Sequence, residues 1–306
     1  MSTDVGTAAP TPAAGPAKGP KQRSGSLAAD AWHELIRDPV FLISSAMVLI
    51  VLSWAIVPQL WTSAGPDGGK CILLENRQPP SADHPFGTTV QGCDMYAHVI
   101  LGARPSIIIA VVVTFGAILI GVIAGIVSGF YAGWIDTLVS RVTDVFLGLP
   151  FILGALVFLA LLRSHSIWAV SFILILLSWP TITRIMRGSV IGVKALDYVE
   201  AARALGASNG SIVLKHVLPN AIQPVIVLAP LLLGTFVSAE ATLTFLGVGL
   251  QIPEISWGIT IAQGQDLAVA GYPHLLIFPC AALVVTVLAF ILMGDALRDA
   301  LDPRGR

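Results

Sequence analysis

Two cysteines and two histidines in one polar stretch carry the side chains most able to do chemistry in this chain. His84 lies between Cys71 and Cys93, and His98 follows them. Thiolates and imidazoles bind zinc, but this spacing matches no standard zinc site. Thiols outside a reducing compartment instead oxidise readily to a disulfide. We predict a structural Cys71–Cys93 disulfide that closes a loop of roughly 20 residues, with a metal site as the alternative.

A carboxylate stands within an apolar stretch in the last third of the chain. Glu240 lies on the same face of a predicted helix as Phe236 and Leu243. An ionisable group inside a membrane marks a functional site by default, so these three residues are a candidate path for a solute. The other interpretation is a structural carboxylate held by buried partners. Asp295 differs, because Arg298 one turn later predicts an ion pair at the membrane surface.

The sequence contains no site that could hydrolyse ATP. Residues 65–70 (GPDGGK) lack the spacing of a Walker A loop and the Ser or Thr that follows its Lys. No other set of residues is arranged for covalent catalysis. We therefore expect that the chain is not an enzyme and binds no cofactor. If ATP drives the protein, ATP and Mg²⁺ bind to another chain.

Composition places the elements that carry these residues in a membrane. Apolar residues make up 55% of the chain and charged residues only 11%, against about 25% charged residues in a soluble domain. The net charge of −1 argues against nucleic acid as a partner. The length allows several spans of about 20 residues each, but leaves no room for a separate ATPase domain.

The chain divides into four parts. Residues 1–38 are a Pro- and Ala-rich basic tail, expected to be disordered, that ends in a short amphipathic helix over 28–37. Residues 39–61 form the first span, residues 62–104 a polar extracytoplasmic segment, and residues 105–304 the remaining spans. The predicted spans are residues 40 to about 60, 106–129, 140–162, 167–186, 221–246 and 275–295.

Glycines and prolines indicate where these spans pack and bend. The second span carries a small-residue face that would let another helix approach closely. This face consists of Gly116, Gly121, Gly125 and Gly129. Prolines interrupt several spans and free backbone carbonyls, which predicts a bundle with a polar interior. These prolines are Pro150, Pro180, Pro224, Pro230 and Pro279. Residues 259–267 predict a short re-entrant helix between the last two spans.

The distribution of Lys and Arg orients the bundle. With the N-terminus inside, the inner ends and loops carry Lys18, Lys21, Arg23, Arg37, Arg141, Arg184, Arg187, Lys194, Arg203, Lys215, Arg298, Arg304 and Arg306. The outer set is only Lys70, Arg77, Arg104 and Arg163. The positive-inside rule therefore predicts that both termini and residues 198–220 are cytoplasmic.

Residues 198–220 form the longest polar, helix-prone stretch between two apolar runs. The Ala-rich sequence around Glu200 and Arg203 favours a helix, which Gly206 ends. Ser211 can cap a second short helix over 212–217, which Pro219 limits. The pattern predicts a helix–turn–helix that projects from the cytoplasmic side of the membrane.

The sequence of this stretch resembles the EAA loop of permease subunits of ATP-binding-cassette importers, and here the loop would span 187–220. In that family the loop is the cytoplasmic helix that docks on the ATPase subunit. Lys215 and His216 before Leu-Pro-Asn are similar to the dipeptide, oligopeptide and nickel branch, in its second, C-type subunit. The positions that the resemblance assigns to the docking loop are Tyr198, Glu200, Ala201, Ala202, Ala204, Leu205, Gly206, Lys215, His216, Leu218 and Pro219.

Four other stretches resemble the same branch. Residues 84–104 are similar to its pattern HPxGTDxxGRD…GAR, with Thr89 in place of the Asp and Cys93 in place of the Arg. Residues 133–144 resemble its first cytoplasmic turn. Residues 243–258 resemble its SFLGLG…SWG signature, and residues 294–304 its usual ending. The ordered motifs extend the resemblance over about residues 38 to 304.

The resemblance implies an all-α membrane protein with six transmembrane helices, the type I ABC importer permease fold and both termini cytoplasmic. Its setting would be the cytoplasmic membrane of a prokaryote. The implied partners are a second, homologous permease subunit, two cytoplasmic ATPase subunits or domains, and an extracytoplasmic solute-binding protein. The implied cargo is di- or oligopeptides, moved by alternating access.

Two alternatives to this function stay open. The same architecture could import nickel, haem or another chelate, because a permease sequence alone does not decide the cargo. A stand-alone secondary transporter or channel would need buried ion-binding charges or an internal repeat. The sequence offers few such charges and no evident repeat, and that alternative leaves residues 198–220 unexplained.

Overall fold

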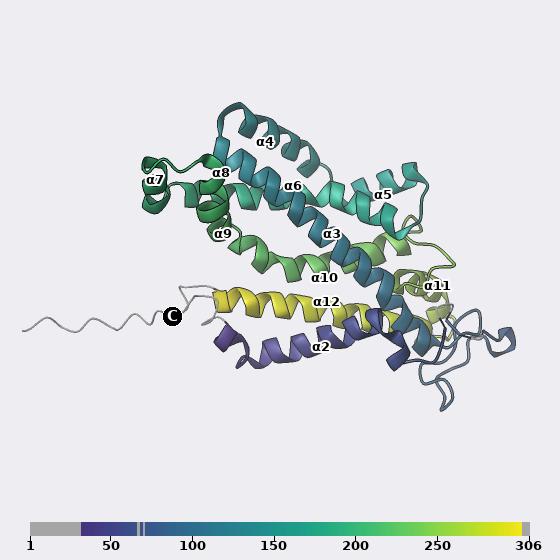
Figure 1. Ribbon diagram of the computed structural model, residues 1–306. Coiled ribbons are helices and arrows are strands. Elements are labelled where there is room, and N and C mark those ends of the chain that lie inside the picture. The colour runs from purple at the N-terminus through teal and green to yellow at the C-terminus, as the bar shows by residue number, and fades with distance from the viewer. Residues whose placement is uncertain (1–31, 66–67, 70, 302–306) are drawn as a thin grey trace, which may run out of the picture.

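The computed structural model describes residues 32–65, 68–69 and 71–301, and this part of the chain is almost wholly helical (Figure 1). Its β-structure is one bridge between Thr88 and Asp94. The helices of the bundle are α2 Pro39–Ile56, α3 Met95–Tyr131, α4 Gly133–Leu147, α5 Phe151–Leu162, α6 Ile167–Lys194, α10 Gln223–Phe245, α11 Trp257–Val269 and α12 His274–Leu301. The predicted basic tail, residues 1–31, lies outside the described residues, and a single helical turn at 32–35 is the described part of the predicted amphipathic helix.

Five of these helices are long and apolar enough to cross a membrane, namely α2, α3, α6, α10 and α12. The predicted span at 140–162 is bent, because α4 and α5 meet there at an angle of 85°, at the proline that was predicted to interrupt it. Pro150 is the N-cap of α5 and has no N–H group with which to continue the hydrogen bonding of α4. The bent pair supplies a sixth crossing when its two halves are counted together.

The second span is longer than predicted. It begins at Met95, where the Asp94 carboxylate accepts a hydrogen bond of 3.0 Å from the Tyr96 N–H. The last residues of the predicted polar segment 62–104 are therefore helical, and Pro105 lies inside α3. With 37 residues, α3 is about 55 Å long. Its first turns thus extend beyond a hydrocarbon layer of about 30 Å.

Helices α3 and α6 share the largest helix–helix contact in the described chain, and the predicted glycine face forms it. Gly121, Gly125 and Gly129 of α3 face, in that order, Ile182, Met186 and Val190 of α6. A Cβ atom on any of these glycines would lie only 2.6 to 2.9 Å from the facing Cβ atom. The two backbones can approach this closely because the glycines have no side chains.

The two ends of the bundle differ (Figure 1). Residues 198–220 lie at one end, together with the start of α2 and the end of α12. The opposite end carries the segment between α2 and α3, and helix α11. The first span therefore begins, and the last span ends, on the same side of the bundle as residues 198–220. An even number of crossings requires this arrangement.

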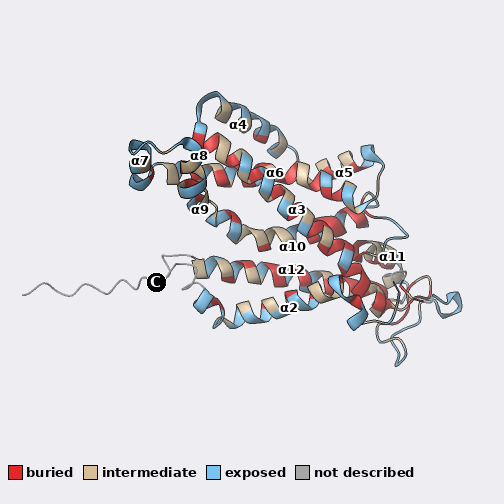
Figure 2. Ribbon diagram, in the orientation of Figure 1, coloured by how far each residue is buried: buried red, intermediate tan, exposed pale blue. Residues whose placement is uncertain are grey.

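Buried residues form two apolar clusters. The larger one joins α2, α3, α5, α6, α10, α11 and α12, and Figure 2 shows buried residues concentrated where α3 passes α10 and α11. The smaller cluster joins residues 198–220 to α3, α6 and α10. That second cluster is a continuous apolar contact between the polar end of the molecule and its spans.

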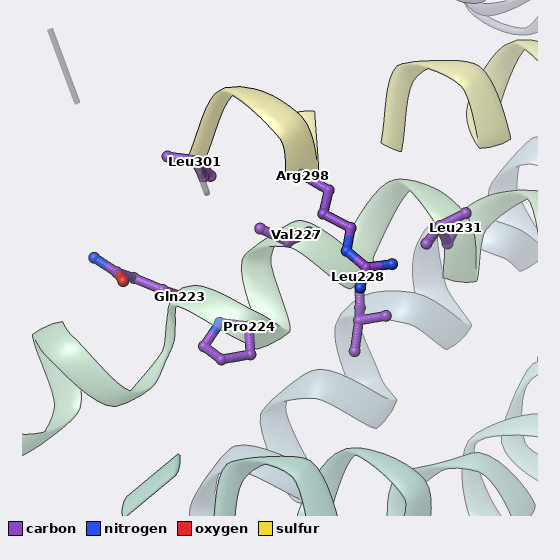
Figure 3. A pocket seen from close by; sticks show the side chains of 7 residues that line it. All are labelled: Gln223, Pro224, Val227, Leu228, Leu231, Arg298 and Leu301. Atoms are coloured by element: carbon purple, nitrogen blue, oxygen red, sulfur yellow. The ribbon is translucent and has the colours of Figure 1, made fainter. Parts of the chain in front are cut away.

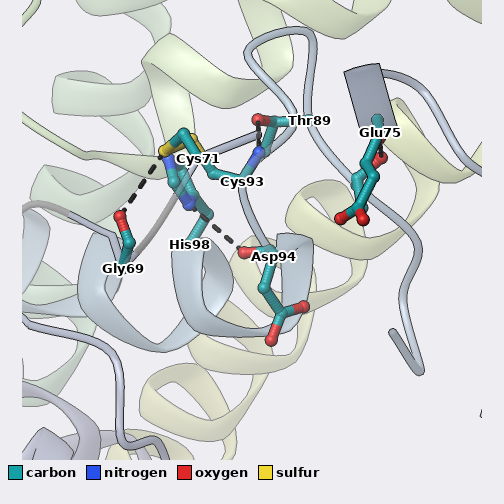
Figure 4. Close-up of a disulfide and its surroundings, with 8 residues drawn as sticks. Gly69, Cys71, Glu75, Thr89, Cys93, Asp94 and His98 are labelled. Atoms are coloured by element: carbon teal, nitrogen blue, oxygen red, sulfur yellow. Dashed lines mark hydrogen bonds between the residues drawn. A yellow bond between two sulfur atoms is a disulfide. The ribbon is translucent and has the colours of Figure 1, made fainter. Parts of the chain in front are cut away.

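The segment between α2 and α3 is held by the predicted disulfide. Cys71 and Cys93 are covalently joined (Figure 4), so their sulfurs bond to each other and the alternative metal site is not formed. The Ile72 N–H donates to the Gly92 carbonyl (3.1 Å) beside the bridge. Thr89 and Cys93 are the two positions that depart from the family pattern. They are joined by a hydrogen bond, in which the Cys93 N–H donates to the Thr89 hydroxyl (3.1 Å).

Removal of this bridge is expected to destabilise the segment. A Cys71→Ser, Cys93→Ser double variant should lose about 2–4 kcal/mol of stability, because the unfolded segment is no longer constrained. Thermal unfolding of the purified chain with and without reductant measures the loss. Cys280→Ser is the matched control, since Cys280 is a free cysteine. Two free thiols in non-reducing peptide mapping of native membranes would contradict the assignment.

Candidate coupling surface

Helix α7, Asp197–Ala204, forms the first half of residues 198–220. Asp197 and Glu200 lie in its first turn and Arg203 in its last. Acidic groups near the N-terminus and a basic group near the C-terminus complement the helix dipole, which stabilises a helix of only 8 residues. Val199 is its buried residue. The rest of the α7 surface is thus available to a partner.

Gly206 ends α7 in a Schellman turn. The Gly206 N–H donates to the Arg203 carbonyl (3.0 Å), and the Ala207 N–H donates to the Ala202 carbonyl (3.1 Å). These two bonds satisfy the last carbonyls of the helix. The φ of Gly206 is +83°, and a Cβ atom there would meet no atom within 4 Å. Glycine is therefore required for its backbone conformation rather than for space.

The second half differs from the predicted single short helix. Ser208, not Ser211, is the cap, and its hydroxyl accepts from the Ser211 N–H at the start of α8, Asn209–Ile212. A π-helical turn, Val213–Val217, then leads into α9, Leu218–Ala221. Pro219 does not end the segment, because it lies in the first turn of α9, where its missing N–H costs nothing.

A side chain of α9 donates a hydrogen bond to a carbonyl of the π-helical turn. The Asn220 side-chain amide donates to the His216 carbonyl at 2.7 Å. The His216 ring lies 6.2 Å from that of Tyr198, which brings the two halves of residues 198–220 together. The Asn of the Leu-Pro-Asn motif therefore has a local structural role. The predicted site residues Tyr198 and His216, from the two halves of the segment, are neighbours in space.

The predicted docking residues lie mostly on the surface. Tyr198, Glu200, Ala201, Ala204, Leu205, Gly206, Lys215 and Pro219 are exposed, and Ala202, His216 and Leu218 are half-buried. Two large apolar side chains stand out, because Leu205 is 89% exposed and Leu214 is 66% exposed. We expect these two side chains to supply the apolar part of a contact with a partner. Leu214 was not predicted, although it falls between the buried positions Ile212 and Val217.

The opposite face of the segment is anchored in the smaller cluster. Val199, Ile212 and Val217 are each 0% exposed. They pack in one cluster with Ile182, Met186 and Val190 of α6, and with Val225 of α10. Because the close packing of a protein interior transmits displacement, a movement of the exposed face would carry α6 and α10 with it.

Charged contacts hold α4 and the end of α3 against α6 near this segment. The Arg187 guanidinium binds the Asp136 carboxylate in two places, at 2.6 and 2.7 Å. Arg184 pairs with Asp144 at 2.9 Å. The Lys194 ammonium donates to the Gly129 and Phe130 carbonyls at 2.9 and 3.2 Å. Lys194 therefore caps the C-terminal end of α3, where a cation also complements the helix dipole.

Glu240 lies deep in the bundle with partners from its own chain. It is 0% exposed. Its carboxylate accepts hydrogen bonds from the Ser106 hydroxyl (2.6 Å) on α3 and from the Thr244 hydroxyl (2.9 Å) on α10. Phe236 and Leu243 are also buried. The contacts favour the interpretation of a structural carboxylate.

The residues of the SWG signature position α11. The Ser256 hydroxyl caps it by accepting from the Ile259 N–H (3.3 Å). Trp257 is fully buried, and its indole donates to the Val99 carbonyl of α3 (2.8 Å). A Cβ atom on Gly258 would lie 2.8 Å from the Ala241 carbonyl of α10. The signature is therefore a packing motif that fixes α11 between α3 and α10.

Glu240→Gln is expected to destabilise the bundle by about 1–3 kcal/mol. Gln keeps the shape but brings an N–H₂ group toward hydroxyls that now donate, so one buried group loses its partner. Thermal unfolding in detergent measures this, with Glu254→Gln, an exposed site, as control. Unchanged stability together with an altered preference for charged cargo would contradict the structural role.

The predicted ion pair between Asp295 and Arg298 is wrong. Both side chains are exposed, and within residues 71–301 no ion pair joins either of them to another group. Arg298 instead lines a cavity between α10 and α12 with Gln223 and Pro224. Spacing along one helix allows such a pair but does not require it, and exposed pairs are worth little.

Comparison with known proteins identifies the family. The model of the binding-protein-dependent transport system inner membrane component matches residues 117–306. The chain belongs to this family. A dipeptide transport system permease protein of Alkalihalophilus pseudofirmus is 37% identical over 275 residues, 90% of this chain and 89% of that protein. An oligopeptide transport system permease protein of Bacillus subtilis is 33% identical over 293 residues, 96% and 95% of the two chains.

The fold of this inner membrane component is also found in a solved structure. An inward-facing structure of the MetNI methionine ABC transporter superposes with a TM-score of 0.54 and 22% identity, over 67% of this chain and 96% of that chain. The resemblance to the permease family and the all-α membrane fold are thereby confirmed. As a member of this family, with several apolar helices, the chain is a multi-pass protein of the cytoplasmic membrane and a transport subunit.

Proposed function

We propose that this permease moves di- or oligopeptides across the cytoplasmic membrane as one of two homologous membrane subunits of an ATP-driven importer. Residues 198–220 are its dock for an ATPase subunit, two ATPase subunits or domains bind ATP and Mg²⁺, and an extracytoplasmic binding protein delivers the peptide. The observation that carries the proposal is that the two faces of this segment differ. One face exposes Leu205 and Leu214, and the other packs in an apolar cluster that is continuous with the spans.

The mechanism follows from this build. Closure of the ATPase dimer on ATP would displace the exposed face of residues 198–220. The cluster around Ile212 and Val217 would pass that displacement to α6 and α10, which shifts the bundle from inward- to outward-facing. The coupling requires that the dock makes different contacts with the ATPases in the two states. The peptide cargo is supported by the relatives that carry peptide permease names.

Reconstitution tests the proposed cargo. The chain is co-expressed with a second permease and ATPase subunits from its own organism, placed in proteoliposomes, and supplied with a binding protein from the same organism. The expected result is uptake of a labelled dipeptide or tripeptide that requires ATP. Uptake of a nickel or haem chelate in place of peptide would change the cargo but keep the architecture. Transport by the chain without ATPases would overturn the proposal.

A buried substitution separates docking from transmission. Ile212→Ala removes apolar contact from the second cluster, which costs about 2–4 kcal/mol locally, but leaves Leu205 and Leu214 in place. We expect the ATPases to co-purify with the variant while peptide transported per ATP hydrolysed falls several-fold. Ile226→Ala, at an exposed position of α10, is the control. Parallel losses of ATPase binding and transport would show that the cluster only maintains the fold of the dock.

A further inference from the structure

A cavity opens between α10 and α12 at the end of the bundle that carries residues 198–220 (Figures 1 and 3). Its volume is about 400 Å³, which equals the liquid volume of roughly a dozen waters. The cavity is therefore large enough for a ligand bigger than a single ion. The lining residues are Gln223, Pro224, Val227, Leu228, Leu231, Arg298 and Leu301. Neither the proposed dock nor the buried Glu240 uses this cavity.

The cavity wall combines an apolar face with two polar side chains. Gln223 begins α10 and Leu231 lies eight residues further, a distance of about 12 Å along the helix. Val227, Leu228 and Leu231 supply apolar lining from α10, and Gln223 and Arg298 supply the polar groups. A ligand that fits this wall therefore has both an apolar part and a polar part.

Arg298 gives the cavity a positive charge. Figure 3 shows its side chain reaching from α12 toward Leu228 on α10, away from Leu301 at the end of the helix. Among residues 71–301, its guanidinium has no hydrogen-bond or ion-pair partner within the chain. Asp295 and Asp299 flank it along α12, but neither lines the cavity. A guanidinium held over an apolar wall matches a phosphate whose attached chains are apolar.

We propose that this cavity binds the phosphate of an anionic phospholipid, with Arg298 as its ligand and the acyl chains along Val227, Leu228 and Leu231. A phosphate accepts two N–H hydrogen bonds from a guanidinium, and the Gln223 amide can hydrogen-bond to the polar part of the headgroup. The site would sit beside the start of α10 at Gln223, so the bound lipid would support the helix that follows the proposed dock. The proposal concerns a lipid and holds whichever solute the transporter carries.

The test measures lipid binding by the intact heteromeric complex. Native mass spectrometry in detergent, with phosphatidylglycerol or phosphatidylcholine added at equal concentration, reports the preference for the anionic lipid. We expect Arg298→Gln to lower the apparent affinity for phosphatidylglycerol about tenfold, the size of one lost charge-assisted contact. Leu228→Trp, which keeps the charge but fills the cavity, should lower binding of the same lipid. Arg141→Gln, an exposed arginine of α4, should leave it unchanged.

Four outcomes would overturn the proposal. An unchanged preference for phosphatidylglycerol in Arg298→Gln would show that the lipid binds elsewhere. Displacement of the lipid by inorganic phosphate would assign the cavity to a free anion, and displacement by a dipeptide would assign it to the cargo. Binding by the isolated chain but not by the complex would show that the second membrane subunit fills the cavity.

Discussion

Gly206→Val is expected to abolish coupling while leaving the membrane bundle intact. A β-branched residue disfavours a φ of +83°, so the variant either strains the turn or loses the Schellman bonds to Ala202 and Arg203. Leu205 and the end of α7 would then leave their positions in the dock. We expect co-purification of the ATPases and ATP-dependent transport to fall at least tenfold. Insertion and pairing with the second permease should persist, since Gly206 contacts no span.

Matched variants separate conformation from side-chain size. Gly210→Val makes the same substitution at an exposed glycine in the first turn of α8, where φ is not left-handed and no atom lies within 4 Å. It should retain most ATPase binding. Gly206→Asn should be milder than Gly206→Val, because Asn adopts the left-handed region more readily. Equal losses of ATPase binding in Gly206→Val and Gly210→Val would indicate that binding depends on the exposed surface and not on the conformation of the turn. Full ATPase binding and full transport in Gly206→Val would show that residues 198–220 do not couple ATP hydrolysis to transport.

The sequence predicted features that depend on local chemistry or composition. The end of α7 at Gly206, the disulfide between Cys71 and Cys93, and the small-residue face of α3 were each predicted and are confirmed by the structure. Each rests on a property of the residue itself: the conformational freedom of glycine, the oxidation of paired thiols, and the close packing that small residues allow. Composition alone was enough to predict a membrane protein.

Features that depend on tertiary context were predicted in part or missed. The sequence marked Pro150 as an interruption, but the bend between α4 and α5 also needs a place for α4 to pack, which the ion pair between Asp136 and Arg187 supplies from another helix. The start of α3 at Met95 is set by the Asp94 cap in a stretch whose polarity predicted a loop. The π-helical turn before Pro219 leaves no trace in apolar periodicity. The ion pair joins residues 51 positions apart, whereas the Asp94 cap is local but lies in a stretch whose overall polarity concealed it.

The same reasoning explains the outcome at Glu240. An isolated carboxylate in an apolar stretch predicts either a path or a satisfied structural group, and the sequence around it does not distinguish the two. Its hydrogen-bond partner Ser106 is 134 positions away along the chain. Only the packing of α3 against α10 brings that hydroxyl to the carboxylate. A buried carboxyl group that loses a hydrogen-bond partner costs stability, so these contacts fit a structural role.

Gly125→Val is expected to have the largest effect on folding in this chain. A Cβ atom at this position would lie 2.6 Å from the Met186 Cβ atom and 2.9 Å from the Thr183 carbonyl oxygen. The second neighbour belongs to the α6 backbone, so no change of rotamer relieves the clash and the two helices must separate. Overpacking of this kind costs about 3 kcal/mol or more. It would also displace α6 from the cluster that anchors residues 198–220. Thermal unfolding and monodispersity of the purified chain in detergent measure the effect.

Gly188→Val on α6 is the matched control, because a Cβ atom there would meet no atom within 4 Å. The two variants add the same side chain to neighbouring helices of one pair, so they differ only in what that side chain contacts. Helix propensity favours Val over Gly by a few tenths of a kcal/mol, so Gly188→Val should be neutral or slightly stabilising in the isolated chain. Equal destabilisation by both variants would mean that the α3–α6 contact is looser than its glycines indicate. Wild-type stability in Gly125→Val would show that this contact does not hold the bundle together.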